Sequence, residues 1–182
     1  MQELPQFAAW RFVDTVDGFE IVYTAQGELR GHTSAVEDSK PYAVHYHIRF
    51  DDQWRTREAH VSTDTVAGTL EVKLASDGAG NWTVNDQPRR ELDGLVDIDL
   101  EASACTNTFP VHRLHFPVDE TVRAPAVYVQ ALDLTVRRLD QTYRRIDARR
   151  FHYTSEGGFE AVLRYDASSL IVDYPGIAMR FA

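Results

Sequence analysis

The chain has 182 residues, 43% of them hydrophobic and 26% charged, and its formal net charge is −9. This length is typical of one domain with a substantial core, and we predict a single domain over residues 1–182. The acidic balance argues against a nucleic acid as the main partner, because binding to phosphates requires a positive surface.

Targeting signals are not apparent in the sequence. Apolar residues are spread along the chain, without a run near the roughly 18 to 20 residues that a membrane helix needs. The first five residues, MQELP, have neither the basic nor the apolar segment of a secretory signal. The single cysteine, Cys105, excludes an intramolecular disulfide and fits a reducing compartment. We therefore expect no transmembrane segment and a cytoplasmic location.

Alternating apolar and polar residues predict strands through most of the chain. The alternation is clearest over residues 42–50 and recurs over 70–74, 96–101 and 159–165. Dipeptides typical of turns separate these segments, at Asp17-Gly18, Gln26-Gly27, Asp51-Asp52, Asp77-Gly78, Asn85-Asp86, Gly157-Gly158 and Pro175-Gly176. Many short strands joined by hairpins are the expected result.

One segment, residues 126–156, permits two interpretations. Its apolar residues from Leu132 to Ile146 are spaced by three and four, which is typical of a helix. Residues 126–129 and 132–136 instead alternate as strands do. Six arginines would give a basic patch in either case, and a basic amphipathic helix on a membrane surface is the sharper alternative.

Asp97 and Asp99 are the first candidates for chemistry. In a strand, their carboxylates would project from one face with Cα atoms about 6.5 to 7 Å apart. An inverting glycosidase needs two carboxyl groups about 6.5 to 9.5 Å apart. The alternatives are ion pairs with arginines such as Arg55, Arg57 or Arg113, and hydrogen bonds to sugar hydroxyls. We favour sugar binding over catalysis, because no other residues complete an acid/base scheme.

The segment Trp54-Arg55-Thr56-Arg57 is a second candidate. It places two guanidinium groups on one face of an expected strand, with an indole beside them. A tryptophan can stack on a sugar ring, and an arginine can hold a phosphate or a carboxylate. The alternative is that Trp54 belongs to the core.

Metal and nucleophile motifs are weaker. His45 and His47 form an H-x-H pair that His60 could complete from a neighbouring strand, but we predict no metal site. His112 and His115 lie near Cys105, for which a buried thiol is a better interpretation than a nucleophile. Phosphate-loop and dinucleotide fingerprints are absent from the sequence, and we predict no cofactor.

Several motifs together resemble a bacterial family described as "putative glycolipid-binding". They are LDGLVDIDL at 92–100, TNTFPVHRL at 106–114, WRTR at 54–57, Gly80-Asn81-Trp82, Gln141-Thr142-Tyr143 and DYPGI at 173–177. The resemblance implies an all-β, single-domain spiral β-roll of many short, mostly antiparallel strands around an interior cleft. It would make residues 126–156 strands.

The resemblance also implies a set of ligand-binding residues. They are Asp97, Asp99, Thr106, Asn107 and Arg113, with Trp54, Arg55, Arg57, Gln141, Tyr143 and Tyr174 as companions. An apolar inner surface would then hold acyl chains, while the polar residues at its mouth satisfy headgroup hydroxyls.

We therefore predict a non-catalytic binding or carrier protein for a glycolipid or a related amphipathic lipid, with transient contact to a membrane surface. Two alternatives remain open. One is a hydrolase of glycosidic or ester bonds that uses Asp97 and Asp99. The other is a structural or partner-binding protein in which the same polar cluster is an ion-pair network that stabilises the fold. The sequence indicates no particular oligomeric state.

Overall fold

Strands make up most of the part of the chain that the computed structural model describes, residues 3–14 and 16–182. In the first half they are β1 (Phe7–Phe12), β2 (Val16–Ala25), β3 (Glu28–Glu37), β4 (Lys40–Phe50), β5 (Thr56–Thr65), β6 (Gly68–Ser76), β7 (Trp82–Val84), β8 (Gln87–Pro88) and β9 (Asp97–Leu100). In the second half they are β10 (Thr121–Arg123), β11 (Ala126–Val129), β12 (Val136–Leu139), β13 (Gln141–Arg145), β14 (Arg150–Ser155), β15 (Glu160–Tyr165), β16 (Ile171–Tyr174) and β17 (Ala178–Arg180). One α-helix, α1 (Thr108–Arg113), and 3-10 turns at Arg90–Leu92, Cys105–Asn107 and Glu156–Gly158 complete the set.

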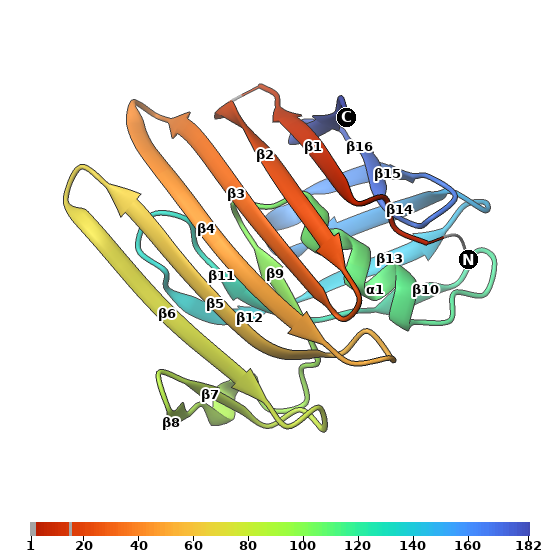
Figure 1. Ribbon diagram of the computed structural model, residues 1–182. Coiled ribbons are helices and arrows are strands. Elements are labelled where there is room, and N and C mark those ends of the chain that lie inside the picture. Colours follow the sequence, from red (N-terminus) through yellow and green to blue (C-terminus); the bar gives the residue numbers. More distant parts are fainter. Residues whose placement is uncertain (1–2, 15) are drawn as a thin grey trace.

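The strands form two sheets. The large sheet has the order β10-β13-β14-β15-β16-β17-β1-β2-β3-β4-β5-β6-β7-β8, and its strand pairs are antiparallel (Figure 1). The small sheet has the order β12-β11-β9, with β9 and β11 parallel. The large sheet ends in the two edges β10 and β8, so it curls without closing into a barrel. The expected all-β roll of mostly antiparallel strands is confirmed.

The alternating pattern explains which face of the large sheet turns inward. Along β4, Tyr42, Val44, Tyr46 and Ile48 are buried, while His45 between them is exposed. Inward-facing side chains from both sheets and from α1 join in one hydrophobic cluster. Because these side chains fill most of the roll, the interior is a packed core rather than an open apolar channel.

Residues 126–156 are strands β11 to β14, not a helix. Their tertiary pairing decides between two patterns that the local sequence leaves equivalent. The basic amphipathic helix considered for this segment is therefore excluded. Among the described residues, no helix is long and apolar enough to cross a membrane.

Strand β9 differs from the half-buried strand that its alternating sequence predicts. All four of its residues are buried, the carboxylates included. It lies inside the roll, where the Thr56 backbone N–H donates to the Val96 carbonyl oxygen at 2.9 Å and the Ile98 N–H donates to the Thr56 hydroxyl at 3.2 Å. The acidic side chains of β9 therefore face protein and pocket instead of open solvent.

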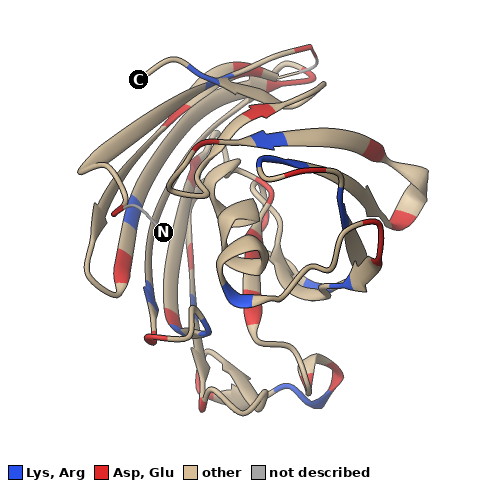
Figure 2. Cartoon of the chain, turned by 90° about the vertical axis from the view of Figure 1, so that its right-hand side faces the viewer, with Lys and Arg blue, Asp and Glu red and all other residues tan. Residues whose placement is uncertain are grey.

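Helix α1 was not expected from the sequence. It lies inside the curl of the large sheet, as Figure 2 shows, and its Phe109 is fully buried. Pro110 fits there because a residue in the first turn of a helix has no intrahelical partner for an N–H. The helix follows the Cys105–Asn107 turn directly, so it fixes the position of the TN motif.

The expected turn at Asp17-Gly18 is wrong, because both residues lie within β2. A Cβ on Gly18 would overlap the carbonyl oxygen of Ser34 on the neighbouring strand. Gly18 thus allows close approach of two backbones, a role that has the same sequence signature as a turn.

Glu20, on the inner face of β2, is a fully buried carboxylate that organises this part of the core. It accepts hydrogen bonds from the hydroxyls of Tyr46 and Ser103 and from the Ala104 backbone N–H at 2.9 Å. Burial raises its pKa to about 7, against the opposing effect of these hydrogen bonds. Gly31 makes the arrangement possible, because a Cβ there would overlap the ring of Tyr46.

We predict that Gly31→Ala lowers the free energy of unfolding by about 1 to 3 kcal/mol, since overpacking forces Tyr46 away from Glu20. Urea denaturation would measure the loss. Ser34→Ala, at an exposed position on the opposite face of the same strand, is the control and should change stability by less than about 0.5 kcal/mol. Equal stability of the two variants would contradict the prediction.

Candidate functional site

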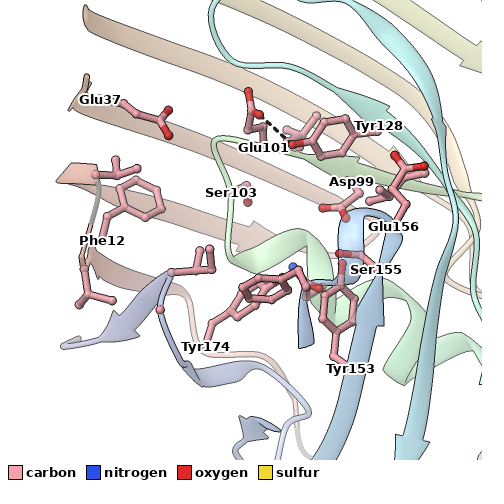
Figure 3. A pocket seen from close by; sticks show the side chains of 18 of the residues that line it. Phe12, Glu37, Asp99, Glu101, Ser103, Tyr128, Tyr153, Ser155, Glu156 and Tyr174 are labelled. Atoms are coloured by element: carbon pink, nitrogen blue, oxygen red, sulfur yellow. Dashed lines mark hydrogen bonds between the residues drawn. The ribbon is translucent and has the colours of Figure 1, made fainter. Parts of the chain in front are cut away.

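A pocket of about 310 Å³ lies between the large sheet, the small sheet and the end of β16 (Figure 3). This volume is at the small end of the range for ligand sites. Its polar lining residues are Glu37, Asp99, Glu101, Ser103, Asn107, Arg137, Ser155 and Glu156. Its aromatic lining residues are Phe12, Tyr42, Tyr128, Tyr153, Phe159 and Tyr174, and aliphatic residues, among them Val13, Val16 and Ile177, complete the wall.

Asp99 is the most buried carboxylate of the pocket, with 6% of its surface exposed. Its Oδ1 accepts a hydrogen bond from the Thr106 hydroxyl at 2.9 Å, and no described basic side chain pairs with it. Burial raises its pKa to about 7, and the nearby carboxylates of Asp97 and Glu101 contribute to the rise. Asp99 is therefore close to half ionised at neutral pH.

Glu101 is held in place by two hydrogen bonds. Its Oε1 accepts from the Tyr128 hydroxyl at 2.9 Å, and its Oε2 accepts from the Ala131 backbone N–H at 2.8 Å. Tyr128 is the register partner of Asp99 in the parallel pair of β9 and β11. The small sheet thus presents two carboxylates and a phenol ring to the pocket (Figure 3).

Arg137 is the one basic side chain among the described residues that line the pocket. It forms an ion pair with Glu156, and its guanidinium carbon lies 4.7 Å from the centre of the Tyr128 ring. This distance is typical of a cation–π contact. Arg137 therefore neutralises Glu156 and leaves the charges of the other pocket carboxylates uncompensated.

Asn107 brings an amide to the pocket. It is 4% exposed, and its Oδ1 accepts a hydrogen bond from the Tyr143 hydroxyl at 2.8 Å. Its backbone oxygen accepts from the Tyr165 hydroxyl at 3.0 Å. The amide nitrogen donates no hydrogen bond to any residue of 3–14 or 16–182, so it is available to a ligand.

Asp97 and Arg113 form a pair outside the pocket. The Nε and Nη2 atoms of Arg113 lie 2.7 Å from the two carboxylate oxygens of Asp97, which is fully buried. Of the pairings considered for the two aspartates, this bidentate pair is the one that forms. Because Asp97 does not line the pocket, it is not positioned to act with Asp99 on a bound substrate.

Trp54, Arg55 and Arg57 also lie away from the pocket. The indole of Trp54 stacks on the ring of His112 in α1, with centroids 3.7 Å apart, and on Phe50 at 4.6 Å. Arg55 and Arg57 both contact Asp51, at 2.9 and 3.7 Å. The two arginines thus pair with a carboxylate from the loop that joins β4 and β5. The indole of Trp54 packs between β4 and α1.

The predicted residues therefore divide into three groups. Asp99, Asn107 and Tyr174 line the pocket. Thr106 and Tyr143 hold Asp99 and Asn107 from behind. The other six do not line it: Asp97 and Arg113 pair with each other, Gln141 is buried with its Oε1 atom unpartnered, and Trp54, Arg55 and Arg57 lie elsewhere. A role for these six in ligand binding stays a prediction.

Sequence reasoning missed most of the pocket. Glu101 continues the acidic alternation of Asp97 and Asp99, so the pattern already contained a signal for it. Phe12 and Glu37 of the large sheet had no signal, because only the curl of the sheet brings them opposite β9.

The alternative motifs lie on other parts of the molecule. His45 contacts His32, with their Nδ1 atoms 2.6 Å apart, and the Nε2 atom of His47 lies 2.9 Å from Glu28. Within the described residues, no group of three or more metal-ligating side chains could hold an ion. Cys105 is fully buried, and burial raises the pKa of its thiol.

An open, curled antiparallel sheet around a polar and aromatic pocket defines this protein as a β-roll with an interior pocket. The chain belongs to the family described as "Putative glycolipid-binding", whose model matches residues 8–180. It is similar to the crystal structure of a DUF1089 family protein from Pseudomonas aeruginosa, with a TM-score of 0.86 and 31% identity over 94% of this chain and 95% of that chain. None of the curated proteins matches the chain.

Proposed function

We propose that this protein binds the headgroup of a glycolipid in the pocket around Asp99 and Asn107, without catalysing a reaction. The observation that carries the proposal is the combination of carboxylates, an amide and hydroxyls with six aromatic rings in one small pocket. Carboxylate and amide groups fix the hydroxyls of a sugar, while aromatic rings pack on its apolar faces. The family to which the chain belongs supports this choice of ligand.

The acyl chains would extend from the pocket instead of filling the roll. A volume of about 310 Å³ suits a headgroup, and the core occupies the remaining interior. Val13, Val16 and Ile177 line the same pocket and offer an apolar surface to the first part of a chain. We propose a binding protein that leaves much of the lipid outside, and a carrier role and a cytoplasmic location stay predictions.

The hydrolase alternative receives less support from the geometry. The hydrolase considered from the sequence uses Asp97 together with Asp99, but Asp97 is paired with Arg113 and does not line the pocket. A panel of chromogenic glycosides and esters tests this alternative directly. Turnover that disappears in Asp99→Asn would contradict binding without catalysis.

We predict that Tyr174→Ala weakens the binding of octyl glucoside at least tenfold, because the variant removes an aromatic wall of the pocket. Isothermal titration calorimetry below the micelle concentration would measure this loss. Tyr23→Ala, which removes an exposed ring on the outer face of β2, is the matched control and should bind as the wild type does.

Tyr174→Phe is a second control, for loss of folding. It keeps the aromatic ring and its packing against Tyr153 and Phe159. The melting temperatures of all three variants should be recorded. Native mass spectrometry after incubation with a bacterial lipid extract would then identify the natural ligand. Absence of any sugar-bearing adduct, together with unchanged titrations for Tyr174→Ala, would overturn the proposal.

A further inference from the structure

The charges that line the pocket are unbalanced. Four carboxylates reach it, from Glu37, Asp99, Glu101 and Glu156, against the single guanidinium of Arg137. Arg137 already pairs with Glu156. Within residues 3–14 and 16–182, the other three carboxylates form no ion pair. An empty pocket with this lining has a negative potential that a neutral sugar would not relieve.

Of these carboxylates Asp99 is buried, whereas Glu101 is exposed but held in place by hydrogen bonds. Asp99 is 6% exposed, and the Thr106 hydroxyl is its one side-chain hydrogen-bond partner among the described residues. Glu101 is oriented by Tyr128 and Ala131. Burying an ionised group without a counter-charge costs free energy, so an unpaired carboxylate beside a cavity indicates that the partner comes from a ligand.

The aromatic residues point to the same kind of ligand. The rings of Tyr128, Tyr153 and Tyr174 line the same pocket as these carboxylates (Figure 3), and Tyr42 lines it too. Aromatic faces attract cations, and the guanidinium of Arg137 already occupies such a position over Tyr128 at 4.7 Å. A second cation deeper in the pocket would meet both carboxylates and ring faces.

From this geometry we infer that the headgroup bound in the pocket carries a positively charged amine, as an amino sugar does. This inference rests on the proposed function and specifies its ligand. The ammonium group would lie near Asp99 and Glu101, and the ring of the sugar would pack on the tyrosines. The raised pKa of Asp99 agrees with this, because a bound cation would favour its ionised form.

Three probes of equal chain length test the inference in the full-length protein: octyl glucosaminide, octyl N-acetylglucosaminide and octyl glucoside. The first has an amine, the second has a neutral amide at the same position, and the third has a hydroxyl. Calorimetry at pH 7 and low salt should give at least tenfold tighter binding of the glucosaminide than of either neutral probe. The preference should shrink at 1 M salt, which screens charge.

The double variant Asp99→Asn/Glu101→Gln should reduce this preference to within twofold. The matched control is Asp52→Asn/Glu71→Gln, which removes two exposed carboxylates outside the pocket and changes the net charge by the same amount. The control should keep the full preference. The single variants Asp99→Asn and Glu37→Gln provide the same comparison if the double variant does not fold.

The outcomes separate the two proposals. Equal binding of all three probes would overturn the inference of a cationic headgroup and leave glycolipid binding standing. Absence of binding by any of the three would overturn both. The final probe is octylammonium, which has the charge but no sugar. If it binds as tightly as the glucosaminide, the inference of a cationic ligand stands and recognition of the sugar is contradicted.

Discussion

Arg113→Met is expected to lower the free energy of unfolding by about 3 to 5 kcal/mol, because it leaves the carboxylate of Asp97 buried without a partner. Both guanidinium nitrogens that contact Asp97 are lost, and the Asp97 side chain is only 1% exposed to solvent that could replace them. Urea denaturation at pH 7 would measure the effect. Arg49→Met, at an arginine that is exposed on β4, is the control and should change stability by less than about 0.5 kcal/mol.

The double variant Asp97→Asn/Arg113→Met distinguishes the cost of an orphaned charge from the contribution of the pair. Replacing both charges removes the unpaired carboxylate, so stability should recover in part relative to Arg113→Met. If Arg113→Met instead matches the Arg49→Met control, the pair does not stabilise the roll. In that case Arg113 returns as a candidate for ligand binding.

The two aspartates of the DIDL motif thus have different roles, although the sequence presents them identically. Asp97 lies where the last residue of α1 supplies an arginine, and Asp99 lies two residues further along β9, where the pocket begins. One of the alternatives weighed for the motif, an ion pair with Arg113, is correct for Asp97. For Asp99 the ligand interpretation remains the proposal.

The strands could be predicted from sequence wherever one face of the sheet meets solvent. The alternation over residues 42–50 gives β4 with its buried face correct. It was misleading for β9, because a polar residue at every second position also occurs in a strand whose polar face is buried against partners. Periodicity could not separate helix from strand over 126–156, and the pairing of β11 with β9 decided it.

The pocket was less accessible to sequence reasoning than the fold. Its walls come from β1 to β4, β9, β11, β12, β14 and β16, which meet only because the sheet curls. Trp54 illustrates a second limit: a tryptophan beside two arginines has the same local sequence whether it stacks on a ligand or on His112. Asn107 was named only because the TN motif resembles that of the family, and it lines the pocket from the turn that leads into α1.

Asp99→Asn is expected to stabilise the protein while it weakens ligand binding. The pKa of Asp99 is about 7 in the folded protein, against an ordinary value of 3.8, so the folded state binds more protons between these two values. The protonated Asp99 therefore makes its full contribution to stability below about pH 4, and this contribution is lost as the pH rises to 7. Since one pKa unit corresponds to about 1.4 kcal/mol, the loss amounts to at most about 4 kcal/mol.

An asparagine at position 99 has the same shape as the aspartate. It can accept the hydrogen bond from the Thr106 hydroxyl, and it does not ionise. The variant and the wild type should thus have similar stability near pH 4, and the variant should be the more stable at pH 7.5. Urea denaturation at a series of pH values measures the difference, in which the effects of all other titrating groups cancel. Glu20→Gln is the matched contrast: this carboxylate accepts hydrogen bonds from four donors, and an amide would turn a donor toward them, so stability should fall at pH 7.5, where Glu20 is mostly ionised. A carboxylate that costs stability and is nevertheless retained in a pocket is the pattern expected of a residue kept for binding. Asp99→Asn less stable than the wild type at pH 7.5 would show instead that Asp99 supports the fold as Glu20 does.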